Sequence, residues 1–203
     1  MLKIKQAIMG VIVMSLLSAG GASAQLTSNQ MAPNFKLNDT KGRPHALAEY
    51  KGKFVVLEWF NPDCPFVKKH YNSGNIPLLQ KQYTSRGVIW LSINSSARGK
   101  QGSYKPQMFD QFMKDKGASP TAVLIDKNGY VGHLYDAQTT PSVFVINPKG
   151  ILIYQGAIDD VPSANIEDLH KAKNYVRAAL DAAMVGKPVA VSATKSYGCS
   201  VKY

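Results

Sequence analysis

The sequence predicts an α/β fold in which a central mixed β-sheet is flanked by helices on both faces. Three observations lead to this prediction. Apolar runs rich in β-branched and aromatic residues alternate with helix-length segments along the chain. Some of these runs are apolar at nearly every position, which is typical of strands buried on both faces of a sheet. Two late runs flank a short turn and predict a hairpin, so the sheet contains antiparallel as well as parallel neighbours.

The strands are placed by apolar runs that turn residues interrupt. Residues 53–60 form the longest such run and suit a central strand. Pro148 and Gly150 give residues 147–150 the composition of a tight turn between two strands. In chain order, the expected strands are residues 35–37, 53–60, 88–93, 122–125, 142–146 and 151–154.

The helices are placed by their start and stop signals. Pro65 suits the first turn of a helix, because its missing N–H would have no helical partner there. That helix is expected to be kinked or interrupted near residues 72–77, where Gly74 and Pro77 disfavour continuity. The expected helices are residues 65 to about 82, 106–116, a short helix after 126–129, and about 165–185.

The amino-terminal residues have the pattern of an export signal. Lys3 and Lys5 precede an apolar run over 7–17, and small residues at 22–24 match the site that signal peptidase cleaves. The run is short for a membrane span, although an uncleaved anchor is the alternative. We therefore expect residues 1–24 to be a signal peptide and the protein to be exported, either periplasmic or secreted.

The remainder is long enough for one domain with one core. No later run approaches the length of a membrane span, so we expect no stable membrane insertion after signal cleavage. The expected organisation is a flexible lead-in over 25–33, a single domain over 34–188, and a C-terminal tail over 189–203 that carries Cys199.

The chain is basic, with a formal net charge of +11. Its Lys and Arg residues are spread along the sequence instead of forming a run, and no nucleic-acid-binding motif accompanies them. A scattered basic balance is typical of a solvated surface. We therefore expect no nucleic-acid partner.

Cys64 and Cys199 are the only two cysteines. In an oxidising compartment such a pair can be bridged, either as a permanent staple or as a working redox pair. Cys64 follows the buried strand and begins the next helix, where backbone N–H groups and the helix dipole favour a thiolate. Lys68, one turn further on, adds positive potential. These features favour a reactive Cys64 over a buried, inert one.

Residues 59–68, which include Asn61, Cys64 and Pro65, resemble the active-site segment of the peroxiredoxin-like branch of the thioredoxin superfamily, also described as redoxin or alkyl hydroperoxide reductase/thiol-specific antioxidant-like. The likeness continues through residues 87–95, 139–146, 154–160 and 198–203. It implies a thioredoxin-like fold and thiol redox or antioxidant chemistry that needs no cofactor.

The resemblance also assigns expected site residues. Thr140 and Pro141 precede a strand, where thioredoxin-like domains place a cis proline that faces the active-site cysteine. Val67 stands where a thioredoxin-type Cys-x-x-Cys site has its second cysteine, so a local dithiol is excluded. Asn61 stands near the position of the peroxiredoxin Thr or Ser, and its amide can donate to a peroxide oxygen.

The function implied is that of an exported thiol oxidoreductase. Cys64 would attack a peroxide or a protein disulfide, Cys199 would resolve the product, and a thiol reductant partner would restore the pair. Two alternatives stay open. One is a non-catalytic binding module with a structural Cys64–Cys199 disulfide. The other is a copper carrier using Cys64, His70 and Cys199. Helical spacing puts His70 off the face of Cys64, which indicates a surface or capping side chain and no metal site.

Overall fold

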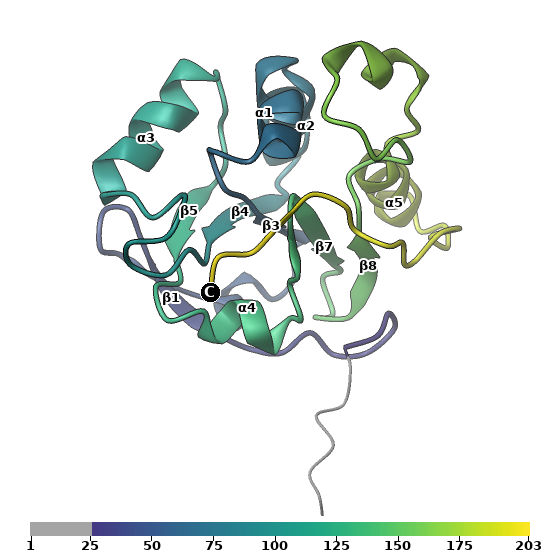
Figure 1. Ribbon diagram of the computed structural model, residues 1–203. Coiled ribbons are helices and arrows are strands. Elements are labelled where there is room, and N and C mark those ends of the chain that lie inside the picture. Colours follow the sequence, from purple (N-terminus) through teal and green to yellow (C-terminus); the bar gives the residue numbers. More distant parts are fainter. Residues whose placement is uncertain (1–25) are drawn as a thin grey trace, which may run out of the picture.

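The structure is a computed structural model that describes residues 26–203. The expected signal peptide, residues 1–24, lies outside the described residues. A seven-stranded mixed sheet forms the centre in the order β2-β1-β5-β4-β3-β7-β8, and a two-stranded sheet pairs β6 with β9 (Figure 1). The strands are β1 (Lys36–Asp39), β2 (Pro44–Ala46), β3 (Val55–Trp59), β4 (Ile89–Asn94), β5 (Ala122–Ile125), β6 (Thr139–Thr140), β7 (Ser142–Ile146), β8 (Leu152–Gly156) and β9 (Cys199–Ser200).

Helices cover both faces of the sheet, which confirms the predicted fold class. Four α-helices lie on one face and α4 on the other (Figure 1). The α-helices are α1 (Pro65–Asn72), α2 (Asn75–Thr84), α3 (Pro106–Asp115), α4 (Tyr130–Leu134) and α5 (Tyr175–Met184). Two 3₁₀ helices are η1 (Leu47–Tyr50) and η2 (Ile166–Lys171).

Strand β3 is an interior strand of the sheet, buried on both faces, as its sequence predicted. It pairs in parallel with β4 and antiparallel with β7, and all five of its residues are buried. It ends at Trp59 and leads directly into the loop before α1. Because β3 is held on both edges, the residues that follow it leave the sheet from a fixed point. Cys64 is the last residue of this loop.

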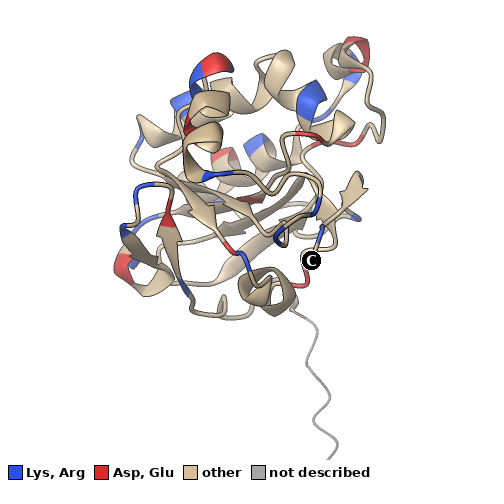
Figure 2. Ribbon diagram, turned by 60° about the vertical axis from the view of Figure 1, so that its left-hand side comes forward, with Lys and Arg blue, Asp and Glu red and all other residues tan. Residues whose placement is uncertain are grey.

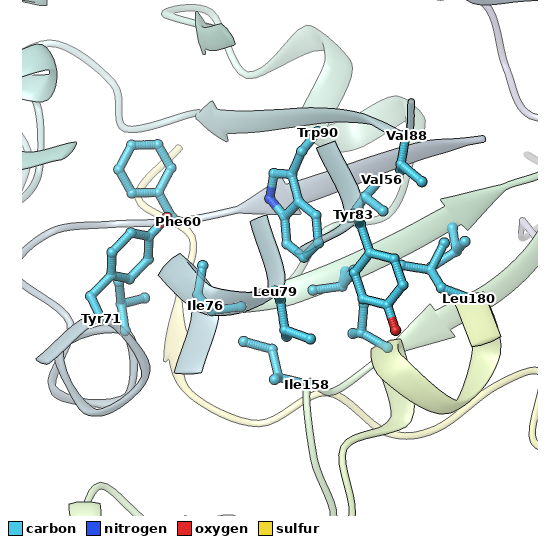
Figure 3. Packing of buried hydrophobic residues seen from close by; sticks show 14 of the residues in the cluster. Val56, Phe60, Tyr71, Ile76, Leu79, Tyr83, Val88, Trp90, Ile158 and Leu180 are labelled. Atoms are coloured by element: carbon cyan, nitrogen blue, oxygen red, sulfur yellow. The ribbon is translucent and has the colours of Figure 1, made fainter. Parts of the chain in front are cut away.

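The larger core lies between the sheet and α1, α2, α3 and α5. Tyr83 and Leu79 of α2 lie against Trp90 of β4, and Leu180 of α5 lies beside Tyr83 (Figure 3). Each of these four side chains has 0% exposure. Helices α2 and α5 are therefore packed on the same face of the sheet as α1.

One predicted helix is divided into two separate elements in the structure. The predicted interruption of the helix after Pro65 is confirmed, because Gly74 has a φ of 77° between α1 and α2. The single helix predicted over about 165–185 is wrong, since η2 and α5 occupy that range as separate elements. Asn174 explains the break: its side chain accepts a hydrogen bond from the backbone N–H of Arg177 (2.8 Å) and so caps a new helix.

The residues before β1 are hydrogen-bonded to the edge of the sheet. The backbone N–H of Asn29 donates to the Leu152 carbonyl (2.7 Å), and that of Ala32 donates to the Gly150 carbonyl (2.9 Å). Residues 26–33, expected as a flexible lead-in, thus lie along β8. No helix within residues 26–203 has the length and apolar character needed to cross a membrane.

Charged residues are distributed over the described part of the molecule. Figure 2 shows Lys and Arg on many separate elements, interspersed with Asp and Glu. This agrees with the scattered basic pattern of the sequence and indicates a solvated surface.

Glu58 is a fully buried acid at the middle of β3. Its carboxylate accepts hydrogen bonds from Tyr71 Oη (2.8 Å), Gln80 Nε2 (3.2 Å), Trp90 Nε1 (2.7 Å) and Ser92 Oγ (3.0 Å). Burial raises the pKa of Glu58, and these hydrogen bonds oppose the rise. The carboxylate therefore joins β3 and β4 to α1 and α2 beneath the residues that lead to Cys64.

Replacing Glu58 by leucine should destabilise the fold by about 3–5 kcal/mol, because four buried donors would lose their acceptor. Urea unfolding followed by circular dichroism measures this loss. The matched control is Glu167→Leu at an exposed position, which should change stability by no more than about 0.5 kcal/mol. A Glu58→Leu protein as stable as the control would contradict the assignment.

Candidate active site

Cys64 caps the N-terminus of α1. Its backbone N–H donates to the Asn61 carbonyl (3.0 Å), and its own carbonyl accepts from the N–H of Lys68 (2.9 Å), while Pro65 occupies the first helical position. The side chain has 0% exposure, and Sγ donates to the Thr140 carbonyl at 3.0 Å. The thiol therefore lies at the start of the helix, as predicted, but inside the protein.

Thr140 and Pro141 lie directly opposite the cysteine. The Thr140–Pro141 peptide bond is cis, which confirms the prediction for this proline. Thr140 belongs to β6 and pairs in the β-ladder with Cys199 of β9. The structure therefore brings Cys64, Thr140, Pro141 and Cys199 together at one place, although Cys199 lies far along the chain.

Both cysteines are free thiols that meet at Thr140: Cys64 Sγ donates to its carbonyl, and Cys199 pairs with it in the β-ladder. Partial burial and the neighbouring Cys64 together raise the pKa of Cys199 to about 11, while Lys202 opposes the rise. Cys199 consequently keeps its proton at neutral pH.

Three further site residues were predicted, namely Asn61, Pro65 and Lys68. Pro65 and Lys68 are exposed on α1, and Lys68 lines a surface groove with Asp63 and Tyr104. Asn61 is buried, and both polar atoms of its amide are hydrogen-bonded. Its Oδ1 accepts from the N–H of Asp63 (2.9 Å), and its Nδ2 donates to the carbonyl of residue 101 (3.2 Å).

A buried cluster that the sequence did not reveal lies further along α1. Lys69 and His70 are 1% and 0% exposed, so the expectation that His70 is a surface or capping side chain is wrong. Lys69 Nζ lies 3.7 Å from Asp159 Oδ2 and donates to the Val161 carbonyl (3.0 Å). The Tyr197 hydroxyl donates to Asp159 Oδ1. No local pattern signals this cluster, because its members come from three distant segments.

Hydrogen bonds determine which ring nitrogen of His70 carries the proton. Its Nδ1 accepts from the amide of Asn75 (2.8 Å), so Nε2 carries the proton and donates to the Tyr197 hydroxyl (3.3 Å). Burial lowers the pKa of His70 to about 4, against the opposing effect of Asp159. The ring is therefore neutral. Lys69 and Asp159 form an ion pair beside it.

Within residues 26–203, no group of three or more His, Cys, Asp and Glu side chains could hold a metal ion. The fold thus does not assemble Cys64, His70 and Cys199 into the ligand set that the copper-carrier alternative requires. Both ring nitrogens of His70 are engaged elsewhere, as described above.

Known proteins share this architecture. Residues 28–155 match the model of the AhpC/TSA family. Thiol-disulfide oxidoreductase ResA of Bacillus subtilis strain 168 is 30% identical over 148 residues, which cover 71% of this chain and 74% of ResA. A hypothetical protein of Sinorhizobium meliloti 1021 superposes with a TM-score of 0.73 at 25% identity, over 88% of this chain and 96% of that one.

The fold itself is thioredoxin-like. The thioredoxin domain of a thiol-disulfide oxidoreductase of Bacteroides vulgatus superposes with a TM-score of 0.52 at 14% identity, over 72% of this chain and 98% of that chain. The family match covers more than half of the sequence and spans Cys64 and the Thr140–Pro141 bond. On these grounds the chain belongs to the AhpC/TSA family of the thioredoxin superfamily.

Proposed function

We propose that this protein is an exported thiol-disulfide oxidoreductase in which Cys64 is the nucleophile and Cys199 the resolving cysteine. The observation that carries the proposal is that both cysteines meet at Thr140, where the Cys64 thiol donates to the carbonyl (3.0 Å) and Cys199 pairs in the ladder, beside the cis Thr140–Pro141 bond. The similarity to ResA, whose name describes a thiol-disulfide oxidoreductase, supports the same class of reaction.

The first step is attack on a substrate disulfide. The Cys64 thiolate forms a bond to one substrate sulfur, and the other substrate sulfur leaves as a thiolate that takes up a proton. The product is a mixed disulfide between Cys64 and the substrate. Cys199 does not compete at this stage, because its raised pKa keeps it protonated.

The second step is resolution. Once Cys64 is part of a mixed disulfide, its sulfur can no longer carry a negative charge, so the contribution of Cys64 to the raised pKa of Cys199 disappears. Cys199 then loses its proton more readily and attacks the Cys64 sulfur. The Cys64–Cys199 disulfide forms, and the second substrate sulfur leaves as a thiol. The substrate has gained two electrons, and a thiol reductant partner must return them to the protein.

The surroundings of Cys64 favour a disulfide over a peroxide as the oxidant. The Asn61 amide, expected as a donor to a peroxide oxygen, already donates to the carbonyl of residue 101, and its oxygen accepts from Asp63. Within the described chain, the hydrogen-bond partner of Cys64 Sγ is the Thr140 carbonyl, which can only accept. A peroxide oxygen at Cys64 would therefore not receive the hydrogen bond that was expected from the Asn61 amide. We propose disulfide-containing proteins as substrates and the periplasm or the cell exterior as the location.

Changing Cys199 to serine should stop the reaction at the mixed disulfide. With a disulfide-linked peptide, the reduced wild-type protein should release both peptide thiols and form the Cys64–Cys199 disulfide, because Cys199 resolves the intermediate. Cys199→Ser should accumulate a Cys64–peptide mixed disulfide, and Cys64→Ser should form no adduct. Intact-protein mass spectrometry distinguishes these species. Adduct formation by Cys64→Ser as fast as in the wild type would contradict the role of Cys64.

Oxidation by peroxide should be slow. With equimolar hydrogen peroxide, Cys64–Cys199 disulfide formation should be no more than about tenfold faster than oxidation of free cysteine, since the Asn61 amide is engaged and does not donate to the peroxide. Oxidation by the peptide disulfide should exceed the free-cysteine rate by a larger factor. Quenched-flow alkylation followed by mass analysis measures both rates. A peroxide rate enhancement greater than the disulfide one would reverse the proposed order of oxidants.

A further inference from the structure

The last residues of the chain cross the active site. We call residues 197–203 the strap. In Figure 1 the yellow C-terminal segment passes in front of β7 and β3 and ends beside α4. The strap includes β9 and therefore Cys199. Two of its side chains, Tyr197 and Tyr203, pack against the rest of the protein, one on each side of Cys199 in the sequence.

The downstream point is a slot for Tyr203. Its ring stacks on His133 of α4, with centroids 3.9 Å apart and planes at 26°, and its hydroxyl donates to the Ala137 carbonyl (2.6 Å). Gly129 and Gly132 line the slot. A Cβ atom at Gly129 would lie 2.5 Å from the tyrosine ring, and one at Gly132 would lie 2.4 Å from its hydroxyl oxygen. The slot exists because both positions lack a side chain.

The upstream point is the buried cluster on α1. The Tyr197 hydroxyl donates to Asp159 Oδ1 and accepts from His70 Nε2, so both of its hydrogen-bonding capacities are used. Its ring packs edge-on against Phe66 at 5.8 Å, and Lys69 Nζ lies 5.6 Å from the ring centroid. Tyr197 is therefore held by charged groups that are themselves buried.

Between these two points the strap approaches the backbone beside Cys64. Gly198 has a φ of 141°, and a Cβ atom there would lie 2.0 Å from the Thr140 carbonyl oxygen. The ladder between β6 and β9 contains only two residue pairs. So short a ladder gives little stability alone. Two further backbone bonds hold the strap: the N–H of Val201 donates to the Gln138 carbonyl (2.9 Å) next to the ladder, and the Lys202 carbonyl accepts from the N–H of Ala97 (2.7 Å) in the loop after β4.

We infer that Tyr197 and Tyr203 are positioning residues that hold the strap closed, so that Cys199 is kept at Cys64 and Cys64 is shielded until the strap detaches. Cys64 has no exposed surface, yet an external disulfide must come into contact with its sulfur. Detachment of the strap exposes the thiol, and its return delivers the resolving thiol. The inference rests on the proposed function because the same two sulfurs react.

Tyr203 offers the cleaner test, because its slot contains no buried ion pair. In a Cys199→Ser background, Tyr203→Ala should raise the rate of Cys64 alkylation by iodoacetamide about tenfold, since the strap loses a stacked ring and a hydrogen bond. The matched control is Tyr130→Ala, which removes an exposed tyrosine from the same helix, α4. The control should alkylate at the rate of the Cys199→Ser parent.

A second readout measures how well Cys199 is positioned. In glutathione redox buffers, the equilibrium between the dithiol and the Cys64–Cys199 disulfide gives the effective concentration of one thiol at the other. Tyr203→Ala should lower this concentration about tenfold, and Tyr203→Phe, which keeps the ring, should lower it less. Tyr197→Phe, which loses only the hydroxyl, should also lower it. Circular dichroism confirms that each variant is folded.

Unchanged alkylation and an unchanged effective concentration in folded Tyr203→Ala would overturn the inference. An equal change in the Tyr130→Ala control would also overturn it, because the effect would then be one of α4 stability. Neither readout requires turnover. A wild-type protein that fails to reduce a peptide disulfide would therefore contradict the proposed function while leaving this test of the strap intact.

Discussion

The position of the second thiol depends on the close approach of two backbone segments, Gly198 and Thr140. A side chain at residue 198 would overlap the Thr140 carbonyl oxygen. The same carbonyl accepts the S–H bond of Cys64, so one peptide group touches both partners of the cysteine pair. Cys199 is thus placed by main-chain geometry, and the ladder that places it is only two pairs long. Its placement then requires side-chain contacts beyond the ladder.

Helix α1 connects the reacting sulfur to one of these contacts. Cys64 caps the helix, and Lys69 and His70 lie in its later turns, where they face Asp159 and Tyr197. Removing one member of a buried ion pair costs about 3–5 kcal/mol, because the other charge is left unpaired. The Lys69–Asp159 pair therefore belongs to the stable part of the fold. The strap, with half-buried residues and few backbone bonds, belongs to the part that opens at lower free energy.

The sequence predicted those features that local pattern determines. The strand over 122–125 was predicted with the bounds that β5 has, and the break near Gly74 followed from a residue that tolerates positive φ. The break before α5 was missed because the cap at Asn174 competes with an otherwise continuous helical pattern. The cis bond at Pro141 was predicted through the family resemblance, because local sequence alone does not select cis.

The contacts of the strap could not be predicted, since each depends on residues that only the folded chain brings together. Tyr203 and Gly132 are far apart in sequence, and neither residue signals the other. This separation has a chemical consequence. In a Cys-x-x-Cys site the resolving thiol is always within one helical turn of the nucleophile, whereas here Val67 occupies that position. Resolution then requires the strap to be seated, and attack on a substrate requires it to be displaced. The two steps need opposite states of one segment, so the order of the reaction follows from the order in which the strap opens and closes.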